Sequence, residues 1–378
     1  MTFAKLLTRS PLPYDAALGA ETAARLGDHG AEIKELIAGT AGCSPYLKGL
    51  IERDIDWVNA VLDTTPELAF AGIIEDTQAL APGDLQQGLR KAKGRIALLT
   101  ALADLGGIWS LEQVTKALTQ FADLATDRAI KAMIANEVTR GALKEAGEDG
   151  TAGLVALAMG KMGAFELNYS SDIDLIMLID GARYDADSYG EARAALVRAT
   201  RRMARLLSDL TGDGYVFRTD LRLRPDASVT PVCLSMDAAE SYYESVGRTW
   251  ERAAYIKARA CAGDIAAAGT VAIRISQMTG WVSFTLMGIY SNIGEVEDGI
   301  NTLTPPHTLV DASDAVDLTS TGEVAFDDVS FAYGRSVGGV TGIDLHIKSG
   351  EKLGIVGASG AGKSTLVALL LRLYDPES

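Results

Sequence analysis

Histidine and cysteine are both scarce in this sequence, with only three of each among 378 residues. They are His29, His307 and His346, and Cys43, Cys233 and Cys261. Because none of the histidines lies near another, histidine-based metal or catalytic-triad chemistry has little material to work with. The cysteines match no zinc-binding or disulfide spacing, which favours a reduced, cytoplasmic setting.

Positive charge and long apolar runs are also in short supply. A net charge of −15 argues against a general nucleic-acid-binding surface, although a local basic patch can still bind phosphate. The N-terminal segment Met1–Arg9 has no long apolar core of the kind found in a secretory signal. The apolar run Trp281–Tyr290 is shorter than the ~20 residues of a bilayer-spanning helix, so it predicts a buried or interfacial helix.

The sequence does contain enough apolar material for a large folded protein. Hydrophobic residues make up 48% of the chain and charged residues 22%, which is typical of globular proteins, and the length predicts two or three domains. Residues 1 to about 150 are expected to be helical, in segments rich in alanine, leucine and charge. These segments are Ala16–Leu26, Ala31–Ile37, Leu85–Leu105 and Leu111–Ala125. The basic cluster Arg90–Arg95 is interpreted as a solvated helix face in preference to a phosphate site.

From Gly153 onward the pattern changes to short apolar runs separated by turns. Leu154–Met159 predicts a buried strand, and the glycine-containing segment Gly160–Gly163 ends it. A second strand is expected in the stretch Ser170–Leu178, where Asp172 and Asp174 lie two residues apart and so point to the same face. Two carboxylates so close together favour a hard divalent cation between them. The alternative is a solvated acidic turn.

A third carboxylate follows a long amphipathic helix expected over Ser188–Leu210. The segment Tyr215–Pro225 alternates like a strand in its second half, with Asp220, Arg222 and Arg224 on one face and leucines on the other. Three carboxylates and two arginines are what metal-dependent nucleotidyl transfer requires, because the acids can hold cations and the arginines can neutralise phosphate oxygens. The competing interpretation is an exposed ladder of ion pairs.

Several segments resemble the glutamine synthetase adenylyltransferase/adenylyl-removing enzymes, in order along roughly residues 1–271. They are Gly160–Gly163, Glu166–Ile176, Asp213–Pro225, Tyr242–Glu244 and Trp250–Arg259. The helical beginning and the Ser-Ser-Asp-Ile-Asp sequence are similar to the N-terminal, adenylyl-removing half of those enzymes. That family belongs to the nucleotidyltransferase superfamily, so the resemblance implies a small mixed sheet with flanking helices.

The resemblance also implies roles for individual residues. Asp172 and Asp174 would be the metal-binding pair for Mg²⁺ or Mn²⁺, and Asp220 the third carboxylate. The expected phosphate contacts are Ser170, Ser171, Arg222 and Arg224, while Lys257 and Arg259 are weaker candidates that could instead pair with Glu251 in a helical stretch Trp250–Ala260. The implied reaction is phosphorolysis, in which phosphate removes AMP from a tyrosine of glutamine synthetase as ADP. Glutamine synthetase and a PII-type regulatory protein are the implied partners, with no nucleic acid.

A second motif begins a new region after Gly322. Val324–Tyr333 and Gly342–Ile347 alternate like strands, and Lys352–Val356 predicts a buried strand before the glycine-rich segment Gly357–Thr365 and an apolar helix, Thr365–Leu373. The strand, loop and helix order is typical of a P-loop that binds ATP or ADP. Its expected phosphate-binding residues are Gly357, Gly360, Gly362, Lys363, Ser364 and Thr365, with Ser364 also a ligand of Mg²⁺.

Residues from about 276 to 378 resemble an ABC exporter from the end of its last membrane helix into its nucleotide-binding domain. Tyr333 matches the aromatic residue that stacks on adenine in that family. The family's later catalytic motifs would lie after Ser378, so no ATP hydrolysis is expected from this stretch. Membrane association, at the inner face of the cell membrane, is expected only if the segment 276–293 is an exposed membrane-helix remnant.

The sequence thus predicts a multi-domain α+β protein. We expect a helical region at 1–150, a nucleotidyltransferase core at 151–271, a linker with an apolar helix at 272–321, and an incomplete P-loop α/β fragment at 322–378. Three functions stay open: an adenylyl-removing nucleotidyltransferase, an ATP-binding fragment of an ABC exporter, and a fused chain without a joint function.

Overall fold

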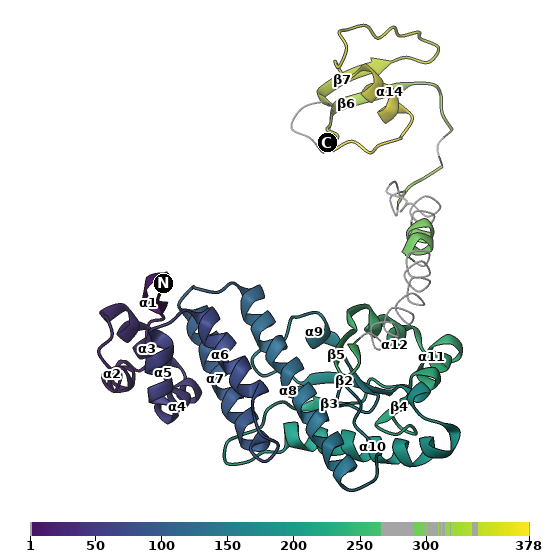
Figure 1. Ribbon diagram of the computed structural model, residues 1–378. Helices are drawn as coiled ribbons and strands as arrows, with labels where there is room; N and C mark the ends of the chain where they lie inside the picture. The colour runs from purple at the N-terminus through teal and green to yellow at the C-terminus, as the bar shows by residue number, and fades with distance from the viewer. Residues whose placement is uncertain are drawn as a thin grey trace. The chain divides into compact units, whose positions relative to one another are not determined.

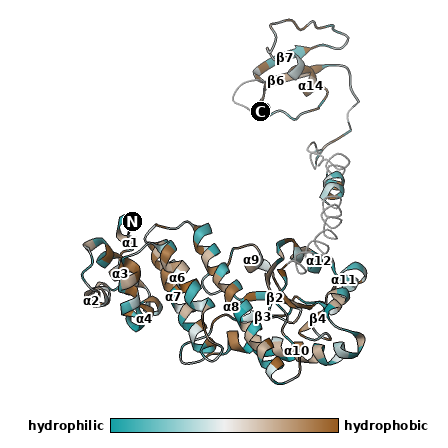
Figure 2. Cartoon of the chain, in the orientation of Figure 1, coloured by the Kyte–Doolittle hydropathy of each residue, from teal (hydrophilic) through white to brown (hydrophobic). Residues whose placement is uncertain are grey.

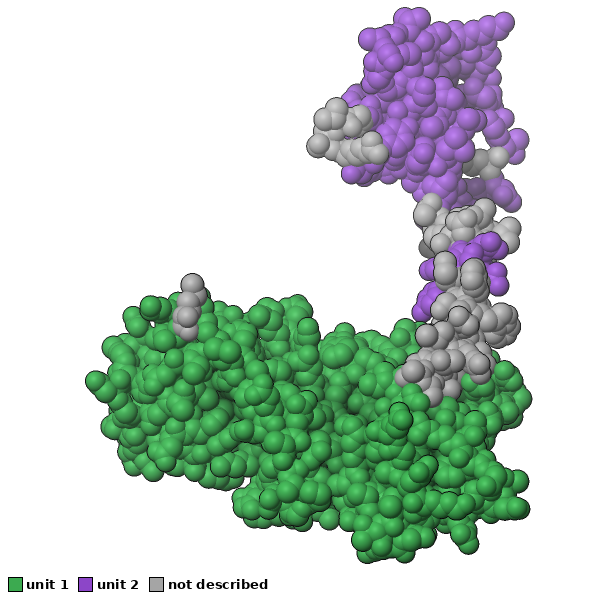
Figure 3. Space-filling view, in the orientation of Figure 1, with its two compact units in different colours: residues 1–288 green, residues 289–378 purple. Residues whose placement is uncertain are grey.

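The computed structural model describes residues 2–265, 290–297, 300, 309, 311, 314–317, 319–334 and 339–377. The chain divides into two compact units, Met1–Gly288 and Ile289–Ser378 (Figure 3). The expected apolar helix Trp281–Tyr290 lies outside the described residues except for its last residue, as does most of the expected linker 272–321. Within the described ranges, no helix is both long enough and apolar enough to cross a membrane.

The first unit begins with eight helices, as the alanine- and leucine-rich segments predict (Figure 1). They are α1 (Phe3–Leu6), α2 (Ala16–Ala24), α3 (Ala31–Cys43), α4 (Pro45–Arg53), α5 (Ile55–Leu62), α6 (Pro66–Gln78), α7 (Leu85–Leu105) and α8 (Leu111–Thr139). Side-chain oxygens of Asp15, Ser44, Thr65 and Ser110 accept hydrogen bonds from the first turns of α2, α4, α6 and α8. These caps satisfy backbone N–H groups that the helices leave unpaired, which explains where the helices begin.

The interpretation of Arg90–Arg95 as a solvated helix face is wrong for two of its residues. Arg90 is 3% exposed and Lys93 is 8% exposed. The reason is that α7 packs against α3, α4, α6 and α8, so little of its circumference faces water. Only tertiary packing decides this, because the sequence of α7 alone carries basic residues on a helix that could equally lie at the surface.

A mixed sheet with flanking helices follows, which confirms the predicted fold class (Figure 1). Its strands are β1 (Leu154–Ala158), β2 (Ile173–Ile179), β3 (Thr219–Asp220), β4 (Cys233–Ser235) and β5 (Arg259–Ala262). The path β3-β2-β1-β5 runs across the sheet, with β1 antiparallel to both β2 and β5. The other edge of β2 is shared: β3 pairs with its beginning and β4 with its end, both in parallel.

The two faces of the sheet belong to two hydrophobic cores, because strand side chains alternate. Ile173, Leu175, Met177 and Ile179 pack into the large core formed with the N-terminal helices and α10 (Ala186–Ser208). Ile176 and Leu178 pack into a smaller core with α11 (Met236–Ser245) and the tyrosines 243 and 255. The central strands are therefore hydrophobic along most of their length (Figure 2), and Asp174 lies on the same face as Ile176.

Two sequence-based elements are wrong in part. The helix expected over Trp250–Ala260 is α12 (Thr249–Ala254) and the 3₁₀ turn η2 (Tyr255–Lys257), and Arg259 already belongs to β5. The strand expected in Tyr215–Pro225 is only β3, because the backbone N–H of Arg222 donates to Asp220 Oδ1 at 2.8 Å and turns the chain. Two shorter elements of the described residues are α9 (Gly160–Gly163) and the 3₁₀ turn η1 (Gly181–Arg183).

In its described residues, the second unit contains a helical segment at 290–297, a two-stranded antiparallel sheet and the helix after the glycine-rich loop. The strands β6 (Val324–Phe331) and β7 (Val340–Ile347) match the predicted alternation, and the helix α14 (Lys363–Leu370) follows the glycine-rich loop. The predicted buried strand Lys352–Val356 is wrong: the segment is not a strand, and Val356 is 92% exposed. An apolar run becomes a buried strand only beside partner strands, and the sheet of this described unit consists of β6 and β7 alone.

Candidate functional site

The pairing of β2 with β3 brings two of the three predicted carboxylates together. Asp174 of β2 and Asp220 of β3 are direct register partners in a parallel pair. Neighbouring strands lie about 4.8 Å apart, and register partners in a sheet point to the same face. The carboxylates of Asp174 and Asp220 therefore share one face at the edge of the sheet, although 46 positions separate them in the sequence.

Asp172 lies just before β2 and is held by an arginine. The guanidinium Nε of Arg218 donates to Asp172 Oδ1 at 2.5 Å, and its Nη2 donates to the backbone carbonyl of Ser170 at 2.8 Å. Both partners of this ion pair are about half exposed. Arg218 therefore fixes the turn that carries Asp172, a role that the sequence did not reveal because 46 positions lie between the two residues.

The electrostatic environment differs between the paired carboxylates. Burial raises the pKa of Asp174 above its ordinary value, and the negative charges of Asp220 and Asp172 raise it further. The pKa of Asp220 is lowered, chiefly because Arg222 donates hydrogen bonds to both of its oxygens. Asp174 is thus the carboxylate whose negative charge is least compensated by the protein, which is the position where an added cation would be most stabilising.

A glycine next to Asp174 belongs to the site, although the sequence assigned it no role beyond ending a strand and matching a family segment. Gly160 has a φ of +55°, and a Cβ placed on it would lie 3.0 Å from Asp174 Oδ2. The backbone N–H of the preceding residue, Met159, donates to the carbonyl of Asp174 at 2.9 Å. A side chain at position 160 would crowd the carboxylate, so the glycine keeps that side of Asp174 open. Its position directly after the β1 strand was the available signal.

The four predicted phosphate-contact residues of this unit do not gather at one point. Arg222 lies at the paired carboxylates and its side chain is 85% exposed. Arg224 donates to the carbonyls of Leu221, Ala227 and Thr230 and so holds its own loop together. Ser170 and Ser171 line a large cavity next to α7.

Lys257 and Arg259 do not pair with Glu251. Lys257 Nζ donates to Glu166 at 2.8 Å, and Arg259 donates to both oxygens of Asp123 in α8. Glu251 instead accepts from the Tyr242 hydroxyl. Arg259 therefore ties β5 to the N-terminal helices.

The carboxylates do not form a ready-made ligand cluster. Among the residues that the structure describes, no three histidine, cysteine, aspartate or glutamate side chains are grouped closely enough to hold a metal ion. The reason at this site is visible in the contacts: Asp172 turns toward Arg218, and Asp220 turns toward Arg222. The carboxylates lie near one another at the edge of the sheet, but Arg218 already pairs with Asp172 and Arg222 with Asp220.

In the second unit, the P-loop residues lie in sequence order before and at the start of α14. Lys363 Nζ donates to the carbonyls of Gly357 and Ala358, at 2.9 Å and 2.6 Å, so the lysine folds back over its own loop. Gly360 and Gly362 both have φ near +85°, a conformation that favours glycine. The remaining predicted residues of the loop are Ser364 and Thr365, in the first turn of α14.

Tyr333 lies in an aromatic cluster. Its ring packs edge-on against Phe331 and Tyr374, with ring centres 4.9 Å and 5.3 Å apart. Its hydroxyl donates to the Thr365 hydroxyl at 3.3 Å. Tyr333 is therefore attached to the helix that follows the P-loop, and it is 44% exposed.

Comparison with known proteins confirms both resemblances. A family model described as glutamate-ammonia ligase adenylyltransferase matches residues 34–271, and one described as ABC transporter matches residues 340–378. A bifunctional glutamine synthetase adenylyltransferase/adenylyl-removing enzyme of Caulobacter vibrioides is 47% identical over 238 residues, covering 61% of this chain and 24% of the relative. Its counterpart in Rhodopseudomonas palustris strain CGA009 is 45% identical over 260 residues, covering 66% and 26%. The chain thus spans about a quarter of the length of the curated relatives it matches.

Proposed function

The chain belongs to the glutamate-ammonia ligase adenylyltransferase family, and we propose that its first unit carries out metal-dependent adenylyl transfer on glutamine synthetase. The family's members are nucleotidyltransferases. The observation that carries the proposal is the parallel pairing of β2 and β3, which places Asp174 opposite Asp220 with Asp172 two residues earlier. The relatives of this chain are named for both adding and removing adenylyl groups, and we propose removal as the direction.

The three carboxylates have the donor chemistry for a divalent cation, which would replace the guanidinium groups of Arg218 and Arg222 at two of them. Asp172, Asp174 and Asp220 would hold it through carboxylate oxygens, the donors that Mg²⁺ and Mn²⁺ prefer. Supporting this fit, Asp174 is partly buried beside two other acids, an arrangement that raises its pKa and that a positive ion would relieve. When bound, such an ion supplies Lewis-acid stabilisation of negative charge on phosphoryl oxygens.

The protein's own groups would position the reacting phosphates. In the removal direction, an oxygen of inorganic phosphate forms a bond to the phosphorus of the AMP–tyrosine link while the bond from phosphorus to the tyrosine oxygen breaks. The tyrosine oxygen takes up a proton, and ADP leaves. Arg222 is exposed beside Asp220, so its guanidinium can turn from that carboxylate to an incoming phosphate. Gly160 leaves room for the substrate beside Asp174.

The test is release of ADP from adenylylated glutamine synthetase in the presence of phosphate and Mg²⁺. Asp174→Asn and Asp172→Asn keep the size of the side chain but remove a charged ligand, so both are expected to lower the rate by at least about a hundredfold. Asp187→Asn, an exposed position in α10, is the matched control and should match the parent chain. Equal rates in Asp174→Asn and Asp187→Asn would contradict the catalytic assignment. A PII-type regulatory protein is proposed as a further partner, tested by its effect on the same rate.

A second candidate function is supported by the P-loop. We propose that residues 357–365 bind the phosphates of ATP or ADP, with Lys363 leaving its loop carbonyls for phosphate oxygens and Ser364 as a ligand of Mg²⁺. The match of residues 340–378 to the ABC transporter model supports this assignment. Binding of a fluorescent ATP analogue should be lost in Lys363→Ala and kept in Lys352→Ala, whose lysine precedes the loop. Equal binding by the two variants would remove the proposal.

A further inference from the structure

A cavity of about 680 Å³ lies between α4, α7 and the segment 210–217 that leads to β3. We call it the α7 cavity. Leu47 and Leu50 of α4, Ala97 and Ala101 of α7, and Val216 and Phe217 form its apolar walls. Its volume falls in the range of sites that enclose small organic molecules, and mostly apolar walls with a few polar groups are typical of such sites.

Lys93 is the unusual residue of the α7 cavity. The side chain lines the cavity, yet the residue is only 8% exposed, and its Nζ lies 4.1 Å above the ring centre of Phe217. Among the described residues, Lys93 forms no ion pair with a carboxylate and donates no hydrogen bond that would satisfy its ammonium group. Burial without a counter-charge lowers the pKa of Lys93 to about 8. A buried charge without a partner is costly, so a ligand that supplied one would be strongly favoured.

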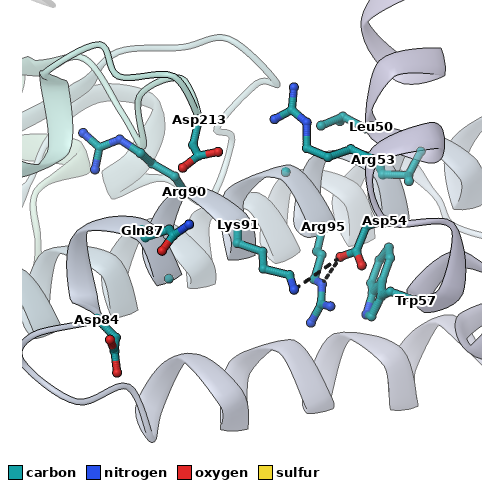
Figure 4. Close-up of a pocket in the computed structure, with 13 residues that line it drawn as sticks. Leu50, Arg53, Asp54, Trp57, Asp84, Gln87, Arg90, Lys91, Arg95 and Asp213 are labelled. Carbon is teal, nitrogen blue, oxygen red and sulfur yellow. Dashed lines mark hydrogen bonds and ion pairs between the residues drawn. The ribbon is translucent and has the colours of Figure 1, made fainter.

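The neighbouring basic residues of the same helix behave differently. Lys91 and Arg95 turn to an outer pocket, where both are paired with Asp54 of the α4–α5 connection, at 4.0 Å and 2.8 Å (Figure 4). In that pocket, Asp54 supplies a counter-charge to both Lys91 and Arg95. Lys93 therefore differs from Lys91 and Arg95 in facing the α7 cavity, and no ion pair among the described residues accounts for the position of its charge.

The other charged and titratable groups that face the α7 cavity do not supply a counter-charge for the ammonium group of Lys93. Arg90 donates to the backbone carbonyls of Leu206, Asp209 and Gly214. The carboxylate of Asp104 forms an ion pair with Arg9 at 3.9 Å and accepts from the hydroxyl of Tyr169. The remaining groups are Arg53, Asp213, Tyr46 and Tyr215. Burial raises the pKa values of Tyr46 and Tyr169, so these phenols stay neutral where the ammonium of Lys93 titrates. With three basic and two acidic side chains, the lining has an excess of positive charge.

We propose that the α7 cavity binds a small organic anion with an apolar or aromatic body, whose charged group pairs with the ammonium of Lys93. The body of the ligand would contact Phe217, Ala97 and the leucines of α4. The size of the space excludes a bare inorganic ion as a good fit, because most of the apolar wall would then stay unfilled. Two acidic side chains in the lining disfavour ligands that carry several negative charges.

The site also has a consequence for the carboxylates, which rests on the proposed function. Ser170 and Ser171 line the α7 cavity, and the carbonyl of Ser170 accepts from Arg218, the residue that holds Asp172. An occupant that shifts this turn changes the position of Asp172. Binding to the cavity is measured with a fluorescent probe, whereas adenylyl removal is measured as ADP release. Absence of the expected probe binding would therefore contradict the cavity site alone, and absence of the expected ADP release would contradict the proposed function alone.

The probe for the test is anilinonaphthalene sulfonate, an aromatic monoanion whose fluorescence rises in apolar surroundings. The full chain is expected to bind it at one saturable site at neutral pH. Lys93→Met keeps the apolar stem and removes the charge, so affinity should fall about tenfold or more. Lys91→Met is the matched control on the same helix and should bind like the parent chain. Ala101→Phe fills the cavity without touching the charge and should abolish binding.

The pH dependence gives a second readout. Affinity should fall as the pH rises through about 8, because the neutral amine no longer attracts the sulfonate, and this inflection should be missing in Lys93→Met. Binding equal in Lys93→Met and the parent chain, or losses equal in Lys93→Met and Lys91→Met, would overturn the proposal. If Ala101→Phe does not fold, acetylation of Lys93 mapped by mass spectrometry replaces it: the probe should protect Lys93 and not Lys91, and equal labelling with and without the probe overturns the site.

Discussion

Single side chains at this sheet edge take their properties from neighbours that are remote in sequence. Asp174 lies opposite Asp220 through strand pairing, and Gly160 in the turn after β1 keeps space open beside its carboxylate. Asp172, two residues away, has instead a half-exposed arginine partner. The two acids of one short motif therefore differ in environment. The proposed cation would chiefly stabilise Asp174, whose negative charge the protein compensates least.

Gly160 offers a test of this open space. Gly160→Ala places a methyl group about 3.0 Å from Asp174 Oδ2 at a backbone angle that alanine adopts with strain. We expect a loss of about 1–2 kcal/mol in the free energy of unfolding and a loss of adenylyl-removing activity of more than tenfold. Gly190→Ala is the control, because this helical glycine has open space around its Cβ position, and it should stabilise α10 by about 0.5–1 kcal/mol. Parent-like activity in Gly160→Ala would argue against a substrate path beside Asp174.

Lys93 predicts a specific dependence of stability on pH. The folded chain releases the proton of this lysine near pH 8, whereas the unfolded chain keeps it to about pH 10.5. Since the unfolded state binds more protons in this window, the free energy of unfolding rises with pH, by about 3 kcal/mol in total from this residue. Urea denaturation between these pH values, compared for the parent chain and Lys93→Met, measures the effect. A slope that Lys93→Met leaves unchanged would show that Lys93 is not its source.

At the scale of elements, arginines join the N-terminal helices to the sheet-containing part of the first unit. Arg90 of α7 donates to carbonyls at the end of α10 and in the following turn. Arg259 of β5 donates to Asp123 of α8, and its guanidinium stacks on Phe165 at 4.0 Å. The helical region and the nucleotidyltransferase-type sheet are therefore held together by directional contacts as well as by a shared hydrophobic core.

A buried connection between two helices lies at Glu137. This glutamate of α8 is fully buried, and Arg198 and Arg202 of α10 both donate to it, at 2.7 Å and 2.8 Å. Glu137→Gln leaves the two arginines without their counter-charge, so the free energy of unfolding should fall by about 2 kcal/mol, reduced from the fully buried case because the arginines are partly exposed. Urea denaturation measures it, with exposed Glu191→Gln of α10 as the control. Identical midpoints for the two variants would count against the connection.

At the scale of the whole molecule, the chain contains two compact units with separate phosphate-binding candidates. The first unit contains the paired carboxylates of a mixed sheet, and the second contains a glycine-rich loop before a helix. The contacts described for each set of residues are made with residues of the same unit. The two candidate functions can therefore be separated by point substitutions.

Separate units predict independent effects. Lys363→Ala should abolish binding of a fluorescent ATP analogue by the P-loop and leave ADP release from adenylylated glutamine synthetase unchanged. Asp174→Asn should lower ADP release and leave binding of the ATP analogue unchanged. The double variant should show both losses, each as large as in the single variant. ADP release that falls severalfold in Lys363→Ala would contradict independence and indicate that the two units act together.

The sequence by itself determined the features that depend on local periodicity. The helices of the N-terminal region, the apolar runs of β1 and β2, and the order of glycine loop and helix around Lys363 follow from patterns that each segment carries alone. The motifs around Asp172 and Asp220 were sufficient to identify the family. These properties need no knowledge of which segments meet in space.

Only the tertiary structure decided which residues meet. Burial of Arg90 and Lys93 depends on helices that lie far along the chain. The ending of β3 at Asp220 depends on its pairing with the remote strand β2. The segment Lys352–Val356 is exposed because no neighbouring strand covers it within the described unit. A pattern of residue types does not indicate which acid lies opposite a given base, because the packing of the elements determines these pairs. The unpaired ammonium in the α7 cavity is such a case, since the helix that carries it resembles any basic surface helix until its neighbours are in place.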